Sequence, residues 1–342
     1  MSSEQHKPII AFTVGDINGV GPELIIKALS NKKLLSMCTP VIYGSGKLFS
    51  FYRKVTDSND FNYKQIQSID EVDNRKINLI SCWENEIAIT PGESTKEGGK
   101  ASFISLKAAT KHWVEGHVDA LVTAPINKKN IQNEEFKFAG HTEFLTKEAG
   151  LTDSLMLMTS PNLKMGIVTE HIPLSQVAQS LTKEAIIKKA TILNQTLITD
   201  FGISKPKIAI LGLNPHAGDD GLIGKEEEKV ITPAIEQLKR KNLLAFGPFS
   251  ADGFFGTAQY QNYDGVLAMY HDQGLIPFKT IAFEEGVNYT AGLKLIRTSP
   301  DHGTAYEVAG KGTVNIQSFL QSIYTIIDII KNRKEQVIRV VK

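Results

Sequence analysis

Short apolar runs alternate with amphipathic stretches along most of the chain. Apolar runs of strand length, bounded by glycine, proline or polar residues, predict strands at 8–14, 40–43, 77–80, 120–124, 155–159, 164–169, 207–213 and 265–269. Helical periodicity predicts helices at 22–29, 106–116, 182–201, 225–241 and 316–331. Strands alternating with helices predict a largely parallel α/β/α architecture.

Some segments are less regular. Residues 53–74 are polar and poorly periodic, which predicts a surface segment, and residues 92–100 read as a loop rich in glycine and charge. Beyond residue 279, two β-rich segments are expected, at 280–283 and 287–296.

Length and composition bound the class of protein. A chain of 342 residues exceeds what one core usually supports, so two domains are expected. A net charge of +1 gives no general attraction to nucleic acid, and no apolar stretch is long enough for a membrane span. The polar segment 1–7 precedes an apolar run too short for a signal peptide. Cys38 and Cys82 lack metal-ligand spacing and are expected to be buried thiols, which fits a reducing cytoplasm.

The stretch 267–279 is the richest in chemistry. An apolar strand delivers His271, Asp272 and Gln273, and Gly274 is expected to let the backbone turn. Two other strand candidates end in the same way, one before His171 and one before His216.

The repeated context of these histidines favours a metal site. Ligands sit beyond the carboxyl ends of strands in open α/β sheets, and three imidazoles with an open position are typical of a catalytic metal ion. A histidine at a strand end is more often a hydrogen-bonded structural residue, so the metal interpretation depends on His171, His216 and His271 sharing one context. His6, His112 and His117 are assigned nothing.

Four further residues have open interpretations. Asp272 fits a carboxylate behind a ligand, a ligand from a neighbouring subunit, or a loop cap. Lys279, Asn288 and Arg297 would form a site for a small dianion if they converge, because arginine binds phosphate or carboxylate bidentately and lysine acts as a point charge. The alternative is that they are solvated surface residues.

Two loops allow a structural and a functional interpretation. The segment 15–23 has the spacing G-x3-G-x-G, which is not the dinucleotide fingerprint. A tight strand-to-helix connection and a site for an anion or cofactor explain it equally well. Thr142, next to His141 at a predicted helix start, fits an ordinary N-cap.

Several segments in a fixed order carry a family resemblance. They are residues 15–23, 122–128, 140–145, 213–218, 270–274, 286–288, 297–299 and 301–305. As a set they resemble the 4-hydroxythreonine-4-phosphate dehydrogenases of the pyridoxal phosphate pathway, over nearly the whole chain. The two ends also resemble β-decarboxylating dehydrogenases such as isocitrate and isopropylmalate dehydrogenase, whose G-D-x-I-G-P-E start and H-G-[ST]-A…A-G-K-G cofactor loop have counterparts at 15–23 and 302–312.

The resemblance implies two α/β/α domains with a cleft between them. We expect one domain from residues 1–130 plus 300–342, and a second from residues 131–299 that carries most metal and substrate residues. It also implies a homodimer with the active site at the subunit interface.

The resemblance also implies roles for individual residues. His171, His216 and His271 would bind one divalent ion per subunit, such as zinc, magnesium or cobalt. The substrate would be bound by His141, Thr142, Lys279, Asn288 and Arg297, and NAD or NADP by His302, Gly303, Thr304 and Ala305. The departures from the family pattern, Ile17-Asn18 for Pro-Ala and Lys294 for Pro, concern substrate detail.

The implied reaction is NAD-dependent oxidation of 4-phosphohydroxy-L-threonine at its C3 hydroxyl, followed by β-decarboxylation to 3-amino-2-oxopropyl phosphate. Asp272 and Lys279 are both candidates for the proton acceptor. A dehydrogenase of threonate or erythronate 4-phosphate is one alternative. A trihistidine metal hydrolase is a more distant one, against which the segment 302–312 argues. A non-catalytic phospho-ligand-binding protein is a third.

Overall fold

The computed structural model describes residues 7–341, so the segment 1–6 of the predicted N-terminal tail lies outside the described residues. The chain divides into two compact units. Unit 1 comprises residues 1–151 and 294–330, and unit 2 comprises residues 152–293 and 331–342. The predicted boundaries at 130 and 300 place α5 (His141–Glu148) and β12 (Ile296–Pro300) in the second domain, whereas both belong to unit 1.

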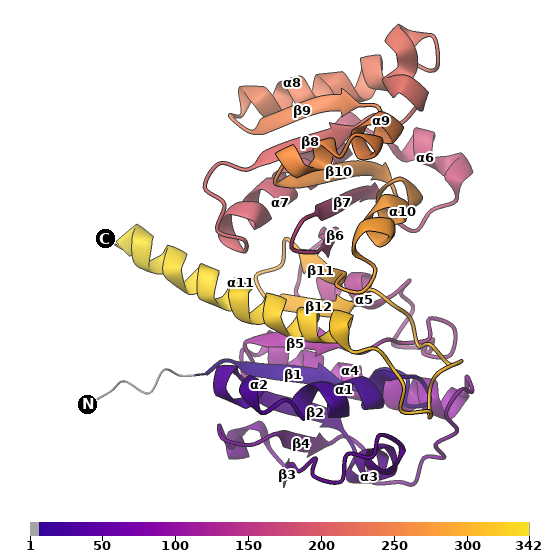
Figure 1. The fold of residues 1–342 in the computed structure, drawn as a ribbon, viewed down its shortest axis with the longest axis vertical. Helices are drawn as coiled ribbons and strands as arrows, with labels where there is room; N and C mark the ends of the chain where they lie inside the picture. Colours follow the sequence, from indigo (N-terminus) through magenta and orange to yellow (C-terminus); the bar gives the residue numbers. More distant parts are fainter. Residues whose placement is uncertain (1–6, 342) are drawn as a thin grey trace. The chain divides into compact units, whose positions relative to one another are not determined.

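Unit 1 is built on a parallel sheet with the strand order β3-β4-β2-β1-β5-β12 (Figure 1). Besides β12, its strands are β1 (Ile9–Thr13), β2 (Thr39–Gly44), β3 (Lys64–Ile66), β4 (Asn78–Ser81) and β5 (Ala120–Thr123). Every residue of β2 and β5 is buried, as expected for parallel strands covered by helices.

Several helices of unit 1 begin at a side-chain cap, which is Asn31, Ser45, Ser68 or Thr95. The helices of this unit are α1 (Gly21–Leu29), α2 (Lys32–Met37), α3 (Gly46–Val55), the short helix η1 (Ile69–Glu71), α4 (Lys96–Val114), α5 and most of α11 (Gln317–Val341). α4 packs against β1, β2 and β5, and α11 places Phe319 against Phe12 of β1.

One expectation for unit 1 was wrong. Residues 96–100 are helical and not loop, because the Thr95 side chain accepts the Gly98 N–H and starts α4 there. The segment 53–74 is mostly exposed or half-buried, as expected for a surface segment, and contains β3, η1 and the end of α3. β3 is a three-residue edge strand with two polar residues, Lys64 and Gln65, so it leaves no apolar pattern.

Unit 2 contains a mixed sheet with the order β11-β6-β7-β10-β8-β9 (Figure 1). The strands are β6 (Leu155–Thr159), β7 (Lys164–Thr169), β8 (Lys207–Leu211), β9 (Leu244–Phe249), β10 (Gly265–Tyr270) and β11 (Val287–Ala291). β6 is antiparallel to both β11 and β7, while β7, β10, β8 and β9 are parallel.

Helices cover both faces of the unit 2 sheet. They are α6 (Leu174–Ser180), α7 (Lys183–Thr199), α8 (Thr232–Arg240), α9 (Ala251–Gly256) and α10 (His271–Ala282), with short helical turns η2 (Pro215–Gly221), η3 (Glu227–Ile231) and η4 (Gln259–Asn262). Alternate strand residues such as Ile167 and Ala268 pack with Leu275 and Phe278 of α10. Gly265, on the opposite face of β10, lies against α7.

α10 overturns two expectations. It begins at His271, directly after β10, so Gly274 lies inside a helix and not in a turn. A Cβ on Gly274 would lie 2.4 Å from the Cδ1 atom of Ile167, so glycine is needed for close packing of α10 on β7. Residues 280–283, expected to be β-rich, form the last turn of α10 and its C-cap. The segment 287–296 is β11 and the first residue of β12, separated by a turn at Gly292.

Two further features concern the length of the helices and the state of the cysteines. Within residues 7–341, no helix is long and apolar enough to cross a membrane. Both cysteines are free; Cys38 is buried as expected, whereas Cys82 is only half-buried. Burial raises the pKa of each thiol to about 12, so neither is a reactive thiolate at neutral pH.

Candidate functional site

Neighbouring parallel strands of unit 2 end in the histidines singled out above. β10 lies between β7 and β8. His271 follows β10, His171 follows β7 after one residue, and His216 lies beyond the end of β8. The three histidine-bearing segments therefore leave the same edge of one sheet, where parallel sheets bind their ligands.

His171 and His271 form a close pair. Their ring centroids are 5.9 Å apart and their planes are inclined by 43°. The Nδ1 atom of His271 lies 2.7 Å from the Oδ1 atom of Asp272. Because a carboxylate accepts, this contact places the proton on Nδ1 and leaves the lone pair of Nε2 free, as in metal-ligating histidines. Two imidazoles bound to one ion at about 2.1 Å would have centroids roughly 5–6 Å apart, so the pair fits a shared ion.

His216 is placed differently. It stands on a left-handed turn and is close enough to Asp252 of α9 to influence that carboxyl electrostatically. A hydrogen bond from Ser250 chiefly lowers the pKa of the Asp252 carboxyl, and His216 lowers it further by a smaller amount. Across the described part of the chain, His171, His216 and His271 do not form a group whose ligand atoms all lie within 4.8 Å of one another. The three-histidine metal site stays a prediction.

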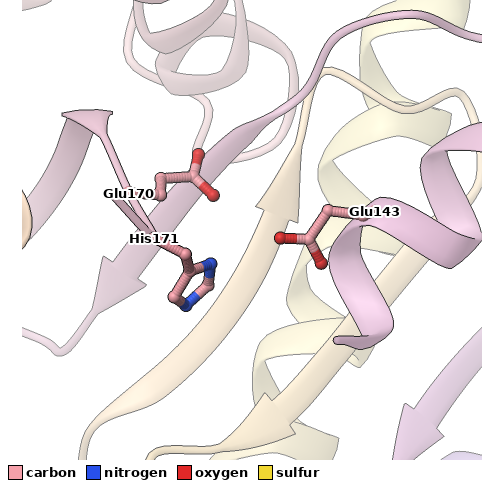
Figure 2. A group of neighbouring side chains, drawn as sticks. All are labelled: Glu143, Glu170 and His171. Carbon is pink, nitrogen blue, oxygen red and sulfur yellow. The ribbon is translucent and has the colours of Figure 1, made fainter. Parts of the chain in front are cut away.

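Glu170 is a neighbour of His171 that sequence reasoning missed. Figure 2 shows both side chains just after β7, and their ligand atoms lie within 4.8 Å of each other. The Glu170 carboxylate accepts a hydrogen bond from Lys189 of α7 at 3.3 Å. The pairing with a cation ties the end of β7 to α7. Figure 2 also labels Glu143, which belongs to the first turn of α5 in unit 1.

Gln273, in the same helical turn as His271, fixes the edge of the sheet. Its Oε1 atom accepts the Met269 N–H at 2.7 Å, and its Nε2 atom donates to the Gly212 carbonyl at 2.6 Å. One side chain therefore joins the end of β10 to the residue that follows β8. The carboxamide of the His-Asp-Gln run is a structural connector and not a reacting group.

The turn that carries His216 is strained. His216, Ala217, Asp219 and Asp220 all have φ between 45° and 53°, with Gly218 at 86° among them. A left-handed conformation costs about 1–2 kcal/mol for each residue other than glycine. Such a turn persists only where its surroundings hold it.

Arg297, on β12 of unit 1, is a buried cation. It is 2% exposed and donates to Thr123 Oγ1 from Nε at 3.0 Å and from Nη2 at 2.6 Å. Burial lowers the pKa of the Arg297 guanidinium to about 9, against the raising influence of the Glu143 carboxylate. The guanidinium is still cationic at neutral pH, as a residue that binds an anion must be.

His141 is the first residue of α5. Burial chiefly lowers the pKa of its imidazole well below the ordinary value, with further lowering from Arg297 and Lys128, so the ring is neutral at pH 7. Its Nε2 atom is buried and has no hydrogen-bond partner within the described residues. Thr142 is not the N-cap of α5, because Gly140 takes that position. The ordinary capping role considered for Thr142 is therefore wrong.

The other predicted substrate residues lie in unit 2. Asn288 is on β11, and its Oδ1 atom is buried without a hydrogen-bond partner among residues 7–341. Lys279 is in the last turn of α10. It follows Asp272 by seven residues, which is two helical turns, so both project from one face of α10.

The glycine-rich segment 15–23 holds the predicted cofactor segment in place. Asp16 and Glu23 are fully buried. Asp16 accepts the Tyr306 hydroxyl at 2.7 Å, and Glu23 accepts the Gly310 and Gly312 N–H groups at 2.6 and 2.9 Å. Both carboxylates were missed at the sequence level.

Among the predicted cofactor residues, His302 and Gly303 lie beside open space. The Thr304 carbonyl accepts the Val20 N–H at 3.0 Å, so this residue is engaged with the chain. His302 has a buried Nε2 atom without a hydrogen-bond partner in the described structure, and a Cβ on Gly303 would meet nothing within 4 Å. An unpartnered ring nitrogen beside open space suits a bound polar ligand.

The family is shown by sequence. The model described as "Pyridoxal phosphate biosynthetic protein PdxA" matches residues 36–326. The chain belongs to this family. A Bacteroides thetaiotaomicron protein named 4-hydroxythreonine-4-phosphate dehydrogenase is 46% identical over 97% of this chain and 92% of its own length. An Oceanobacillus iheyensis protein named "Putative D-threonate 4-phosphate dehydrogenase" is 39% identical over 94% of this chain and 98% of its own length.

Solved structures agree with this PdxA membership. The 4-hydroxythreonine-4-phosphate dehydrogenase of Klebsiella pneumoniae is 34% identical with a TM-score of 0.80, covering 96% of this chain and 99% of that one. Isocitrate dehydrogenase from Methylococcus capsulatus is 11% identical with a TM-score of 0.50, covering 96% and 87%. The second likeness concerns the fold alone and confirms the predicted fold class. The protein is an enzyme of the oxidoreductase class.

Proposed function

We propose that the protein is a 4-hydroxythreonine-4-phosphate dehydrogenase acting in pyridoxal phosphate synthesis as a homodimer. It would oxidise the C3 hydroxyl of 4-phosphohydroxy-L-threonine with NAD or NADP. The resulting β-keto acid would lose its carboxylate as CO2 to give 3-amino-2-oxopropyl phosphate. The observation that carries the proposal is the 46% identity, over 97% of the chain, to the Bacteroides thetaiotaomicron protein of that name.

The anionic substrate would be bound by His141, Thr142, Lys279, Asn288 and Arg297. Arg297 in unit 1 is buried and cationic, and Lys279 in unit 2 supplies a second cation. Binding of the phosphate far from C3 would supply energy that orients the reacting carbon. His141, Asn288 and Thr142 would contact the rest of the substrate. Two unpartnered atoms support this: Nε2 of the neutral His141 ring, and Oδ1 of Asn288, which is a hydrogen-bond acceptor.

The histidines after β7, β8 and β10 would hold one divalent ion per subunit, such as zinc, magnesium or cobalt. The 5.9 Å separation of the His171 and His271 rings supports this set, with His216 as the third ligand. When bound, the ion would act as a Lewis acid toward the substrate oxygen. Asp272 would keep the His271 ring in the tautomer that presents Nε2. Asp272 and Lys279 are the proposed proton acceptors.

Residues 302–305 would bind the nicotinamide cofactor, which accepts the hydride from C3. The unpartnered His302 Nε2 atom and the open space beside Gly303 support this position. Asp16 and Glu23 would keep the segment in place through Tyr306, Gly310 and Gly312. A cofactor site of this type needs no dinucleotide fingerprint.

A dehydrogenase of D-threonate 4-phosphate is the second candidate. The 39% identity to the Oceanobacillus iheyensis protein favours it. The two substrates differ at C2, where one carries an amino group and the other a hydroxyl group. The chemistry at C3 and the residues assigned to it would be the same.

The test follows cofactor reduction and CO2 release together, with 4-phosphohydroxy-L-threonine, D-threonate 4-phosphate or erythronate 4-phosphate as substrate. With the first substrate we expect equal amounts of both products, and a loss of at least about 100-fold in His216→Ala. The matched control is His117→Ala, because His117 is exposed and is far along the chain from any assigned residue. We expect this variant to keep its activity.

Other outcomes are informative. Turnover of a threonate or erythronate phosphate alone would keep the mechanism and replace the substrate. Metal-dependent release of phosphate without cofactor reduction would overturn the dehydrogenase proposal in favour of a hydrolase.

A further inference from the structure

Glu227 is a buried carboxylate that the proposed reaction does not use. It is 6% exposed and opens η3, the π-helical turn that precedes α8. One of its oxygens accepts the backbone N–H groups of Leu213 and Asn214, each at 2.7 Å. The other accepts the Asn214 side-chain amide at 2.9 Å. The carboxylate is thus fully engaged with the segment that leads from β8 to His216.

The Glu227 carboxylate is hydrogen-bonded to the residues before the left-handed turn and lies close to the turn itself. A Cβ on Gly212, before the turn, would lie 3.2 Å from the Oε1 atom of Glu227. A Cβ on Gly218, within the turn, would lie 2.7 Å from its Oε2 atom. The carboxylate therefore occupies the space between the end of β8 and the strained residues 216–220, and both glycines are needed for it to fit.

The π-helical turn explains how a glutamate reaches this position. A π turn contains one more residue than an α turn. The extra residue changes the direction of the side chains before the turn by about 100° relative to those of the helix that follows. Such turns are rare and are frequently found at functional sites. Here an unfavourable helical turn and an unfavourable left-handed turn meet at the same carboxylate.

We propose that Glu227 is a positioning residue for His216. Its carboxylate would fix residues 213–218 so that the imidazole is presented at the carboxyl end of β8. The hydrogen bonds of Glu227 run to Leu213 and Asn214, so it would act on His216 through the turn. The part of the proposal that concerns metal binding rests on the proposed function; the part that concerns the turn does not.

The test compares Glu227→Gln with Glu228→Gln. Glutamine keeps the size of the side chain but turns an NH2 group toward the donating amide of Asn214. Glu228 is the next residue and is exposed, so its variant is matched in position and in charge change. Hydrogen exchange of the amides in residues 212–221 is the first readout. We expect at least tenfold faster exchange in Glu227→Gln and no change in Glu228→Gln.

Calorimetric titration of the metal-free proteins with Zn²⁺ or Co²⁺ is the second readout. We expect Glu227→Gln to bind about 10–100-fold more weakly than Glu228→Gln. If the unaltered protein binds neither ion, the proposed metal site fails, yet the exchange comparison still decides the role of Glu227.

Equal exchange in the two variants would overturn the proposal whatever the metal result. Should Glu227→Gln fail to fold, Glu227→Asp serves in its place. It keeps the charge and withdraws the carboxylate by one methylene group. Unchanged exchange at residues 212–221 in Glu227→Asp would likewise overturn the positioning role.

Discussion

At the scale of single residues, His141 is shaped by its electrostatic surroundings. Its ring is neutral because burial and the nearby cations Arg297 and Lys128 all oppose protonation. A neutral imidazole can donate or accept a hydrogen bond, whereas an imidazolium could only donate. Arg297, which we propose binds the anionic substrate, thus also helps to keep His141 in its more versatile form.

The depressed pKa of His141 predicts a pH-dependent stability. Unfolding releases the ring to an ordinary pKa near 6.5, so below that pH the unfolded chain binds a proton that the folded chain does not. The contribution to stability is fully present above pH 6.5 and is lost as the pH falls toward the folded pKa. At pH 5.5 the loss is about 1.4 kcal/mol relative to pH 7.5.

Urea unfolding at pH 7.5 and 5.5 measures this loss. His141→Gln should lose about 1.4 kcal/mol less than the unaltered protein over the same interval. Burial also lowers the pKa of His112, but that residue is present in both proteins and cancels in the difference. Equal losses would mean that His141 titrates normally when folded.

The sequence singles out the histidines as candidates, and their roles stay a prediction, whereas the buried carboxylates Asp16 and Glu23 leave no such signal. A histidine after an apolar run leaves a local pattern, and the motif resemblance adds more. Glu23 reaches Gly310 across 287 positions, and Asp16 reaches Tyr306 across 290. A carboxylate that accepts a distant N–H or O–H group leaves no spacing in the sequence, because only the tertiary fold brings donor and acceptor together.

At the scale of elements, α10 links the core to the chemistry. Its first residues are His271 and Asp272, while Leu275 and Phe278 pack into the apolar cluster against β7 and β10. Gly274 allows this close approach. The position of the His271 ring is therefore set by how closely α10 lies on the sheet.

Gly274→Ala should destabilise the protein although alanine favours helices. The new Cβ would lie 2.4 Å from Ile167 Cδ1 and 3.1 Å from Ala268 Cβ, so side chains or the helix must shift. We expect a net loss of about 1–3 kcal/mol in the free energy of unfolding. Gly253→Ala in α9 is the control, because its Cβ would meet nothing within 4 Å. It should be neutral or stabilising by up to about 1 kcal/mol. Equal midpoints for the two variants in urea would refute the packing argument.

Helices and strands with a strong apolar pattern were predicted well, whereas those with polar or mixed residues were not. The helix α7 begins and ends close to the expected Thr182 and Gly202. The predicted strand at 280–283 was wrong because Thr280 and Ile281 have high strand propensity, yet they extend a helix already anchored by Leu275 and Phe278. Tertiary packing overrides local propensity there.

At the scale of the whole molecule, α11 belongs to both compact units. Its residues up to 330 are part of unit 1, where Phe319 packs on Phe12. Its residues from 331 belong to unit 2, where Asn332 and Arg333 bind Asp200. The return of the C-terminal segment to the first domain was expected, but its last turns were not assigned to the second. A continuous helix gives no sequence signal at the point where its partners change.

The anchor of α11 in unit 2 is a buried ion pair. Asp200 is 2% exposed and accepts Arg333 Nε and the Tyr289 hydroxyl, each at 2.6 Å. Arg333→Met keeps the aliphatic contacts but leaves Asp200 with hydroxyl donors alone. We expect unit 2 to lose about 2–3 kcal/mol, less than for a fully buried pair because the Arg333 side chain is 26% exposed. Lys334→Met, at the exposed next position, should have no effect.

Hydrogen exchange resolved along the chain tests where this loss falls. In Arg333→Met, amides of α7 and β11 should exchange faster, whereas β1 and β2 of unit 1 should keep their protection, because only the last turns of α11 lose a partner. Faster exchange in both units would instead mean that they unfold as one cooperative body, so that α11 transmits the loss along its whole length. Unchanged exchange everywhere would show that the Tyr289 and Thr199 hydroxyls suffice for Asp200.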